Sequence, residues 1–389
     1  MAPILDGIRV IDLSTGIAGP GSSMYLADQG ADVVRIETPR GHGSQGGSDD
    51  PALDTGTGFS VQNRSKRSLT LDLRKPDGKV VFHRLAQRSD VLITNLRRAA
   101  ATELGADYPT LRALNPRLIY GWVTAFGQRG PYASHGGYDR LTQGLSGAMY
   151  RKWEDGTPVT TGILLSDPSV PMLMAYGVML ALWHREKTGE GQMLETSLLQ
   201  AAVAMQMTSL VKVERSGRSV NDYDMPTYGI YRCADDAYIN VTALRPRQFE
   251  RLCKLLDLDH LVQDPRVFDP AQRDEFRREV YPVIEALFAT KPSKEWLGLL
   301  DDADIPAAPI LERDQVFSEP QLVENNMFVR VEHPRAGPVQ MFAPPITLSA
   351  ADSVIGRAPP LAGEHTTEVL GELGYSNDEI ADLRSRQVI

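Results

Sequence analysis

Alternating strand and helix signals in the first half of the chain limit its fold more than any other feature. Residues 8–13 and 32–37 are rich in β-branched side chains and predict strands, and residues 21–29 between them predict a helix that ends at Gly30. Such a strand–helix–strand unit joins two parallel strands. Further strands are expected at residues 68–73, 91–96 and 118–124, and further helices at 76–88, 139–150 and 167–187. We therefore predict an α/β fold with a doubly wound, Rossmann-like parallel sheet.

The turn after the first strand lacks the glycine pattern of a nicotinamide-binding site. Such turns read G-x-G-x-x-G, whereas residues 14–20 read STGIAGP. The chain has only two cysteines, Cys233 and Cys253, and its His and Cys residues do not show the spacing of metal ligands. We expect no metal site, no disulfide scaffold and no permanently bound cofactor.

The distribution of charge indicates a small anionic ligand. The net charge of −9 argues against general binding to nucleic acids or to anionic membrane surfaces. Residues 35–98 nevertheless contain 12 Lys and Arg against 7 Asp and Glu. A basic region inside an acidic protein suits an anionic small molecule, and chance clustering on helix faces is the alternative. The N-terminus has no signal-peptide pattern, and the longest apolar run, residues 170–183, is shorter than the about 20 residues that cross a bilayer. We expect a cytoplasmic protein.

The second half of the chain changes in character after residue 200. Residues 201–213 are Met-rich with a helical pattern, and residues 215–226 are polar and typical of a linker. A smaller unit follows, with a strand at 238–242 and helices near 247–256, 274–288 and 293–302. Irregular structure is expected at 41–57 and 318–348, and short helices at 366–373 and 377–386.

Asp167 stands at the head of an apolar helix and is followed by Pro168. An Asp–Pro pair at a helix start is typical of an N-cap, worth about 1 kcal/mol. The carboxylate is also a candidate nucleophile, because a reference pKa of about 3.9 leaves it ionised at neutral pH. A helix N-terminus favours this charged form by about 0.3–1 kcal/mol. The residues alone leave both roles open, and the two roles are compatible.

Several short motifs lie along the chain in a defined order. They read LDGIRVIDL at residues 5–13, GADVV at 30–34, NRSKRSL at 63–69, LNPRLIY at 114–120, FGQRGP at 126–131, TGEGQ at 188–192 and PPLAGEHT at 359–366. Each motif is weak by itself. Their order and spacing resemble the class III CoA-transferase family (CaiB/BaiF type), which contains formyl-CoA transferase and the carnitine CoA-transferases. The resemblance covers nearly the whole chain.

The resemblance implies a large Rossmann-like domain built from both chain ends, an inserted smaller α+β domain, and a homodimer whose subunits are interlinked like rings. On this basis the large domain comprises residues 1–200 and 349–389, the small domain comprises 227–317, and the linkers are 201–226 and 318–348. The strand and helix patterns by themselves indicate only the alternation and a linker.

The same resemblance places the catalytic aspartate of the family at Asp167. It implies that CoA passes from an acyl-CoA thioester to a carboxylic acid through an aspartyl anhydride and an aspartyl-CoA thioester. Coenzyme A is then part of a substrate, and its contacts carry over to Ile17, Ala18, Leu71, Asp72, Leu73, Arg74, Asn95, Leu96, Arg97, Gly136, Gly137, Tyr138 and Asp139.

One departure from the family concerns a phosphate contact. Many relatives have a basic residue where this chain has Glu103, and Arg98 is a candidate replacement. Arg74, Arg97 and Arg98 all lie in the basic region and suit phosphate, and a solvated surface role is the alternative for each.

Alternative functions and the substrate class stay open. The α-methylacyl-CoA racemases of the family use a His and a small-domain glutamate where this chain has Tyr138 and Arg245. A tyrosine, with a reference pKa of about 10, is a poor base for moving an α-proton, so transfer is favoured over racemisation. A catalytically silent CoA-binding protein is the third reading. The glycine run of formyl-CoA transferase is absent from residues 242–247, where Arg245 or Arg247 could meet the distal carboxylate of a dicarboxylic acid or remain at the surface.

Overall fold

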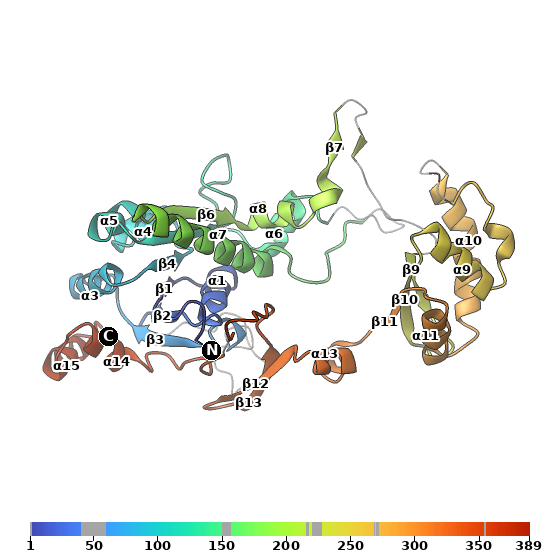
Figure 1. The fold of residues 1–389 in the computed structure, drawn as a ribbon. Helices are drawn as coiled ribbons and strands as arrows, with labels where there is room; N and C mark the ends of the chain where they lie inside the picture. Colours follow the sequence, from blue (N-terminus) through green and yellow to red (C-terminus); the bar gives the residue numbers. More distant parts are fainter. Residues whose placement is uncertain are drawn as a thin grey trace. The chain divides into compact units, whose positions relative to one another are not determined.

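The chain forms two compact units in a computed structural model, and each is described by itself (Figure 1). The first unit combines Met1–Met207 with Asn326–Ile389, and the second unit comprises Thr208–Asn325. The structure describes residues 2–39, 60–149, 157–214, 218–219, 228–267, 269, 272–353 and 355–389. The loop expected at residues 41–57 lies outside the described residues.

A six-stranded sheet forms the centre of the first unit. Its strands are β1 (Arg9–Leu13), β2 (Asp32–Glu37), β3 (Lys66–Thr70), β4 (Val91–Thr94), β5 (Ile119–Thr124) and β6 (Met193–Ser197). They are ordered β3-β2-β1-β4-β5-β6, and every neighbouring pair is parallel. This is the strand order of the Rossmann fold, so the prediction of an α/β fold with a central parallel sheet is confirmed. The sequence pattern did not indicate β6, because this edge strand is polar and largely half-buried.

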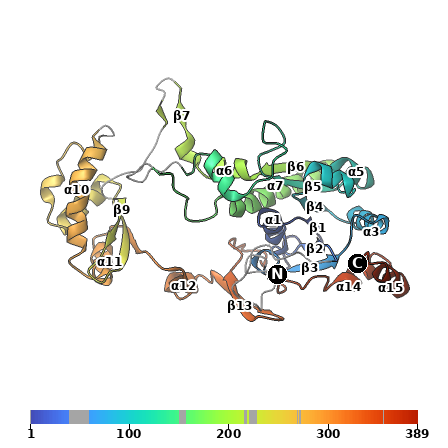
Figure 2. The same cartoon turned by 180° about the vertical axis from the view of Figure 1, so that it is seen from behind.

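Helices cover both faces of this sheet (Figures 1 and 2). The helices of the first unit are α1 (Ala18–Ala27), α3 (Pro76–Gln87), α4 (Arg98–Glu103), α5 (Tyr108–Leu114), α6 (Asp139–Leu145), α7 (Ser166–Thr188), α8 (Leu198–Ala204), α14 (Thr366–Glu372) and α15 (Asn377–Ser385). Alternate residues of each strand point to opposite faces. Ile11 therefore joins the core beneath α3, α14 and α15, whereas Val10 joins the core beneath α1 and α7.

Helices α1 and α7 pack against one another over the sheet. The two backbones approach so closely that a Cβ on Gly21 would lie 2.7 Å from Cγ of Pro171. Each helix connects two parallel strands and therefore runs antiparallel to them. The N-termini of both helices consequently lie at the carboxyl edge of the sheet, where ligands bind in folds of this class.

The second unit has its own core around a three-stranded antiparallel sheet. The sheet is ordered β11 (Ala307–Pro309), β10 (Tyr238–Thr242), β9 (Tyr228–Arg232). Helices α9 (Pro246–Leu255), α10 (Arg273–Phe288) and α11 (Ser293–Asp302) supply most of the remaining core side chains. Both cysteines are free and buried there. Short elements on either side of this core are β7 (Lys212–Val213), β8 (Arg218–Ser219), α12 (Arg313–Val316) and α13 (Pro320–Glu324).

Residues 318–348 are not irregular, and this expectation is wrong. Besides α13, they contain a hairpin of β12 (Phe328–His333) and β13 (Gly337–Phe342) that belongs to the first unit. Val331 pairs with Val339 on the more buried side of the hairpin, and Gly337 closes the turn with a φ of +69°. The interspersed polar residues and prolines concealed this weak alternation.

Candidate active site

The residues expected to bind coenzyme A follow the carboxyl ends of β1, β3, β4 and β5. All these loops meet at one edge because the sheet is parallel. Strands β1 and β4 are neighbours, and the chain continues from β1 into α1 on one face and from β4 into α4 and α5 toward the other. Ligands of doubly wound sheets bind at such a switch point.

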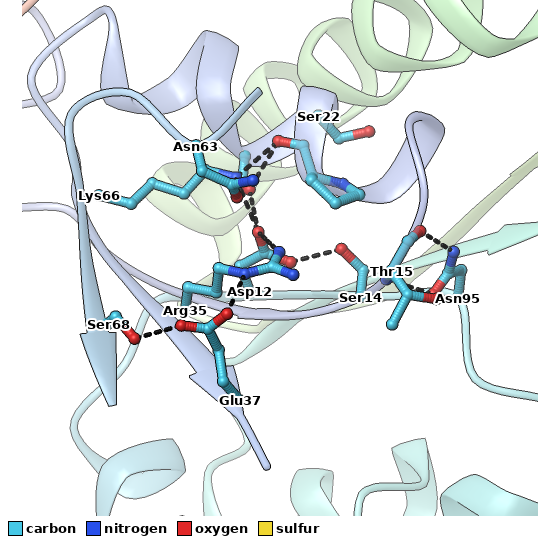
Figure 3. A network of polar contacts seen from close by, with 12 residues as sticks. Asp12, Ser14, Thr15, Ser22, Arg35, Glu37, Asn63, Lys66, Ser68 and Asn95 are labelled. Carbon is cyan, nitrogen blue, oxygen red and sulfur yellow. Dashed lines mark hydrogen bonds and ion pairs between the residues drawn. The ribbon is translucent and has the colours of Figure 1, made fainter. Parts of the chain in front are cut away.

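A pair of hydrogen bonds joins the first two of these loops. The backbone N–H of Thr15 donates to Oδ1 of Asn95 at 3.0 Å, and Nδ2 of Asn95 donates to the carbonyl of Thr15 at 2.7 Å. Asn95 thus holds the loop that leads into Ile17 and Ala18 (Figure 3). The structure brings these three predicted site residues together.

The loop before α6 lies against the same group. A Cβ on Gly136 would lie 2.5 Å from Nη2 of Arg97, so these two exposed residues are neighbours. Gly137 packs on Ala125, and the side chain of Tyr138 is 79% exposed. The segments 95–97 and 136–139 therefore form one surface.

Few of the side chains at residues 71–74 are available to contact a ligand. The side chains of Leu71 and Leu73 are buried in the core. Asp72 accepts hydrogen bonds from Nε and Nη2 of Arg74, both at 2.8 Å, and these bonds lower the pKa of Asp72. Within the described ranges, no hydrogen bond links this segment to Asn95 or Arg97. The exposed guanidinium of Arg74 and the backbone are the groups left for a ligand.

Asp167 does not cap its helix, and the prediction that it does is wrong. It is the second residue of α7, whose N-terminus is capped by Asp139 on α6. Oδ2 of Asp139 accepts hydrogen bonds from the backbone N–H groups of Leu165 (2.8 Å), Ser166 (2.6 Å) and Asp167 (2.9 Å), and from Oγ of Ser166 (2.9 Å). Asp139 is only 2% exposed, and its side chain faces the first turn of α7.

A second layer of hydrogen bonds holds this cap. Oδ1 of Asp139 accepts a bond from Nε2 of Gln143, and Oε1 of Gln143 accepts one from Oγ1 of Thr161 at 3.1 Å. Nε2 of Gln143 also donates to the carbonyl of Ile163 at 3.2 Å. These bonds attach the segment at residues 161–163, which leads into α7, to α6.

The environment of Asp167 makes its carboxyl group less acidic than an ordinary aspartate. Burial is the larger cause and the negative charge of Asp139 is the second, and together they raise its pKa to about 6. Any preference of the helix N-terminus for the charged form is outweighed here, and Asp139 accepts the N–H groups of residues 165–167 that would otherwise be open at this end of α7. At pH 7 about nine-tenths of Asp167 is still ionised.

A buried charged network supports the loop after β1 (Figure 3). Lys66, which is completely buried, donates from Nζ to Oδ2 of Asp12 (2.8 Å), to the carbonyl of Pro20 (2.8 Å) and to Oδ1 of Asn63 (3.0 Å). Oγ of Ser14 donates to the other oxygen of Asp12. Burial lowers the pKa of Lys66 to about 8. Burial alone would raise the pKa of Asp12, but Lys66 and Arg35 hold it at about 2.

The sequence interpretation missed this network. Its signal is the presence of charged residues at strand positions that the pattern assigns to the core, Asp12 in β1 and Arg35 in β2. The network ties β1, β2 and β3 to the first turn of α1. It holds no ligand-facing side chain directly, but it fixes the backbone on which Ile17 and Ala18 lie.

Arg98 is oriented by its neighbours. Its Nη2 donates to Oε1 of Gln128 at 2.6 Å, and its Cζ lies 5.4 Å from the centre of the Trp122 ring. Gln128 in turn donates to Glu195 on β6. The side chain of Arg98 is exposed, whereas Glu103 is joined to Lys79 through its backbone carbonyl. Arg245 and Arg247 are exposed at the start of α9 in the second unit.

A surface cavity in the described part of the chain lies away from these residues. It measures about 460 Å³ and is lined by Asp32, Arg67, Arg357, Glu368 and Glu372, among others. Arg67 is already paired with three of these carboxylates, at 2.9 Å to Glu368 and 2.7 Å to Glu372. This cavity is therefore not the candidate site, despite its size.

None of the described helices is long and apolar enough to cross a lipid bilayer. Across the described ranges, no group of three or more His, Cys, Asp or Glu side chains is arranged to hold a metal ion.

Comparison with known proteins identifies the family. The model of CoA-transferase family III matches residues 5–366. Succinate–glutarate CoA-transferase of Agrobacterium fabrum is 32% identical over 95% of this chain and 96% of its own, and formyl-CoA:oxalate CoA-transferase of Streptomyces coelicolor is 31% identical over 100% of both. The crystal structure of a CaiB/BaiF family protein from Brucella suis matches with a TM-score of 0.85 at 29% identity, over 96% of this chain and 100% of that one. The resemblance is confirmed, and the chain belongs to family III of the CoA-transferases, enzymes that transfer coenzyme A.

Proposed function

We propose that the enzyme transfers CoA from an acyl-CoA thioester to a carboxylic acid with Asp167 as the covalent nucleophile. The observation that carries this proposal is a chain of contacts at the switch point. Asn95 holds the Thr15 loop, Arg97 lies against Gly136, and Asp139 at the end of that segment bonds to Asp167. A coenzyme bound along these loops would reach the half-buried carboxylate of Asp167.

The proposed reaction proceeds in four displacements at carbonyl carbons. The carboxylate of Asp167 attacks the donor thioester, and its C–S bond breaks to leave a mixed anhydride and CoA thiolate. The thiolate attacks the aspartyl carbonyl and releases the donor acid, which leaves an aspartyl-CoA thioester. The acceptor carboxylate attacks this thioester and expels the thiolate. The thiolate then attacks the acceptor carbonyl of the new anhydride, which releases acyl-CoA and restores Asp167.

This sequence needs no general base, because every nucleophile in it is an anion. The raised pKa of Asp167 supports the proposal, since a more basic carboxylate is a better nucleophile while it stays mostly ionised at neutral pH. Exclusion of water protects the anhydrides from hydrolysis. Backbone N–H groups of the glycine-containing loop at residues 14–19 are candidates to stabilise the developing oxyanion, because the first turn of α7 is already used by Asp139.

Two arginines are proposed to receive the phosphates of the coenzyme. Arg97 is exposed at the junction of the two loops, and among the described residues its guanidinium has no hydrogen bond or ion pair. Arg98, oriented by Gln128 and Trp122, is proposed to replace the basic residue that relatives carry at the position of Glu103. Ile17, Ala18, Leu71, Leu96 and Gly137 are proposed to contribute mainly backbone contacts.

The acceptor and donor are proposed to be dicarboxylic acids longer than oxalate. Relatives are named for succinate, glutarate and oxalate, and the absence of the glycine run from residues 242–247 favours the longer acids. Arg245 or Arg247 would bind the distal carboxylate. The test compares the rates of CoA transfer to succinate, glutarate and oxalate with the rates of transfer to acetate and butyrate. The same rates are measured for the variants R245M and R247M. Equal rates with monocarboxylic acids would contradict it.

A homodimer is proposed to be the functional form, with interlinked subunits as the family resemblance implies. Helix α7 exposes Met172, Tyr176, Leu180 and Trp183 at intervals of three or four residues, so they share one face. Tyr176 is 64% and Trp183 63% exposed, and such an apolar stripe is typical of an interface. Light scattering of the wild type and of W183E tests this, and a monomeric wild type would contradict it.

The cytoplasm, where acyl-CoA is made and used, is the proposed location.

The primary test is the variant D167A with mass-spectrometric detection of the products. We expect it to lose CoA transfer while it still binds acyl-CoA. D107A is a matched control, because Asp107 caps α5 through Thr110 N at 3.1 Å and lies outside the proposed site. Transfer by D167A at the normal rate would overturn the mechanism. Exchange of an α-proton without transfer of CoA would instead favour the racemase alternative.

A further inference from the structure

We propose that Asp139 is a positioning residue for the reaction, which acts through Asp167 by holding the first turn of α7 and by keeping a negative charge beside the nucleophile. The proposal rests on the proposed role of Asp167. It differs from the family-based expectation, in which Asp139 is one of the contacts to coenzyme A.

The hydrogen bonds of Asp139 are directed at the backbone that carries Asp167. A single oxygen, Oδ2, accepts the three successive N–H groups of residues 165–167 and the hydroxyl of Ser166. The other oxygen accepts Gln143 Nε2. These donors stabilise the ionised carboxylate in a buried place. The position of the Asp167 side chain therefore follows from the position of Asp139.

Asp139 is also the charge that acts on Asp167. Of the elements packed against α7, helix α1 offers only Tyr25 as a titratable group, β5 only Tyr120, and α8 none. Strand β6 carries Glu195, whose oxygens are bound by Gln128 and Thr124, and α6 carries exposed Arg140 besides Asp139. Along α7 itself the next charged residues, His184 to Lys187, are more than four turns away from Asp167.

The two effects of Asp139 reinforce one another. An open helix N-terminus would favour the ionised form of Asp167 and make it a weaker nucleophile. By occupying these N–H groups and adding its own charge, Asp139 does the opposite, in line with the raised pKa of Asp167. The carboxylate of Asp139 thus keeps Asp167 more basic than a carboxylate at an uncapped helix start would be.

The variant D139N separates charge from shape, because the amide oxygen can still accept the N–H groups of α7. We expect the acid limb of the kcat/KM profile to move to lower pH by about one pH unit, and kcat at pH 7.5 to fall severalfold. D139E, which keeps the charge but displaces it, should retain the acid limb near its wild-type position with a lower kcat. R140Q alters a neighbouring exposed charge on α6 and should leave the acid limb in place.

A titration of Asp167 itself keeps this test independent of activity. The ¹³Cγ signal of Asp167 in labelled full-length protein, assigned by its loss in D167N, should titrate near pH 6 in the wild type and about one pH unit lower in D139N. Identical midpoints in the two proteins would overturn the proposal. If D139N does not fold, a wild-type midpoint near 4 overturns it as well. Undiminished transfer by D167A would reject the proposed function, while the titration would still decide the link between the two residues.

Discussion

The backbone N–H of Asp167 donates a hydrogen bond of 2.9 Å to the carboxylate of Asp139, 28 residues earlier in the chain. This contact joins α6, which follows Gly136 and its neighbour Arg97, to the helix that carries the proposed nucleophile. A movement of the loop at residues 136–139 would therefore change the position of Asp167. The predictions below follow from this connection and from the network beneath the adjacent loop.

The activity should depend on a single acid group near pH 6. Protonated Asp167 cannot attack a thioester, and its pKa is raised to about 6. We expect kcat/KM to be constant above about pH 7 and to fall about tenfold per pH unit below pH 6. Initial rates between pH 4.5 and 8.5 measure this. A midpoint near 4, the ordinary value for an aspartate, would show that burial does not act on the reacting carboxylate.

The variant D167N should be more stable than the wild type at neutral pH. Because the folded-state pKa is raised, the folded protein binds more protons than the unfolded chain between about pH 4 and 6, and its free energy of unfolding falls as pH rises through that window. Asn carries no charge to desolvate. After allowance for the partial exposure of Asp167, we expect a gain of about 2 kcal/mol at pH 7.5 and almost none at pH 4. Urea unfolding at both pH values checks this, and a loss of stability at pH 7.5 would contradict it.

Removal of Lys66 should destabilise the fold, and a second substitution should recover part of the loss. K66M leaves the buried carboxylate of Asp12 with Arg35, at 3.5 Å, as its cationic partner among the described residues, and it removes the donor to the Pro20 carbonyl. We expect a loss of about 3–5 kcal/mol in the free energy of unfolding and a higher KM for acyl-CoA. The double variant D12N/K66M should be more stable than K66M. Additive losses in the double variant would mean that the two residues do not interact.

The substitution G136A should imitate the loss of Arg97. Its new Cβ would lie 2.5 Å from Nη2 of Arg97, and the flexible guanidinium has to move away. We expect G136A and R97Q to raise the KM for acyl-CoA by similar, severalfold factors without loss of stability. R112Q, which removes an exposed arginine on α5, serves as the matched control for charge.

G121A is the contrasting glycine variant. Its Cβ would meet Ile93 Cδ1 at 2.6 Å and Met174 Sδ at 2.8 Å, so it should lower thermal stability instead of acting on KM. If G136A lowered stability and left KM unchanged, Arg97 would have no role in binding.

The strand and helix pattern was sufficient to predict the sheet but not its edge. β1, β2, β4 and β5 are apolar enough to be recognised, whereas the two edge strands β3 and β6 are largely polar, and of these only β3 was predicted, from residue 68 onward. The role of Asp139 had no sequence signal, since its partners are backbone N–H groups that any residue carries. Lys66 lies in a polar motif that is typical of a surface, and only the folded chain reveals its burial between β3 and α1.

Trapping of the acyl-enzyme tests the central claim most directly. The enzyme is mixed with acyl-CoA in the absence of an acceptor, treated with hydroxylamine and digested, and the peptide that contains Asp167 is analysed by mass spectrometry. We expect the hydroxamate at Asp167, formed from the anhydride or the aspartyl-CoA thioester, and none at Asp139. An unmodified Asp167 peptide from enzyme that turns over at the normal rate would contradict the covalent mechanism.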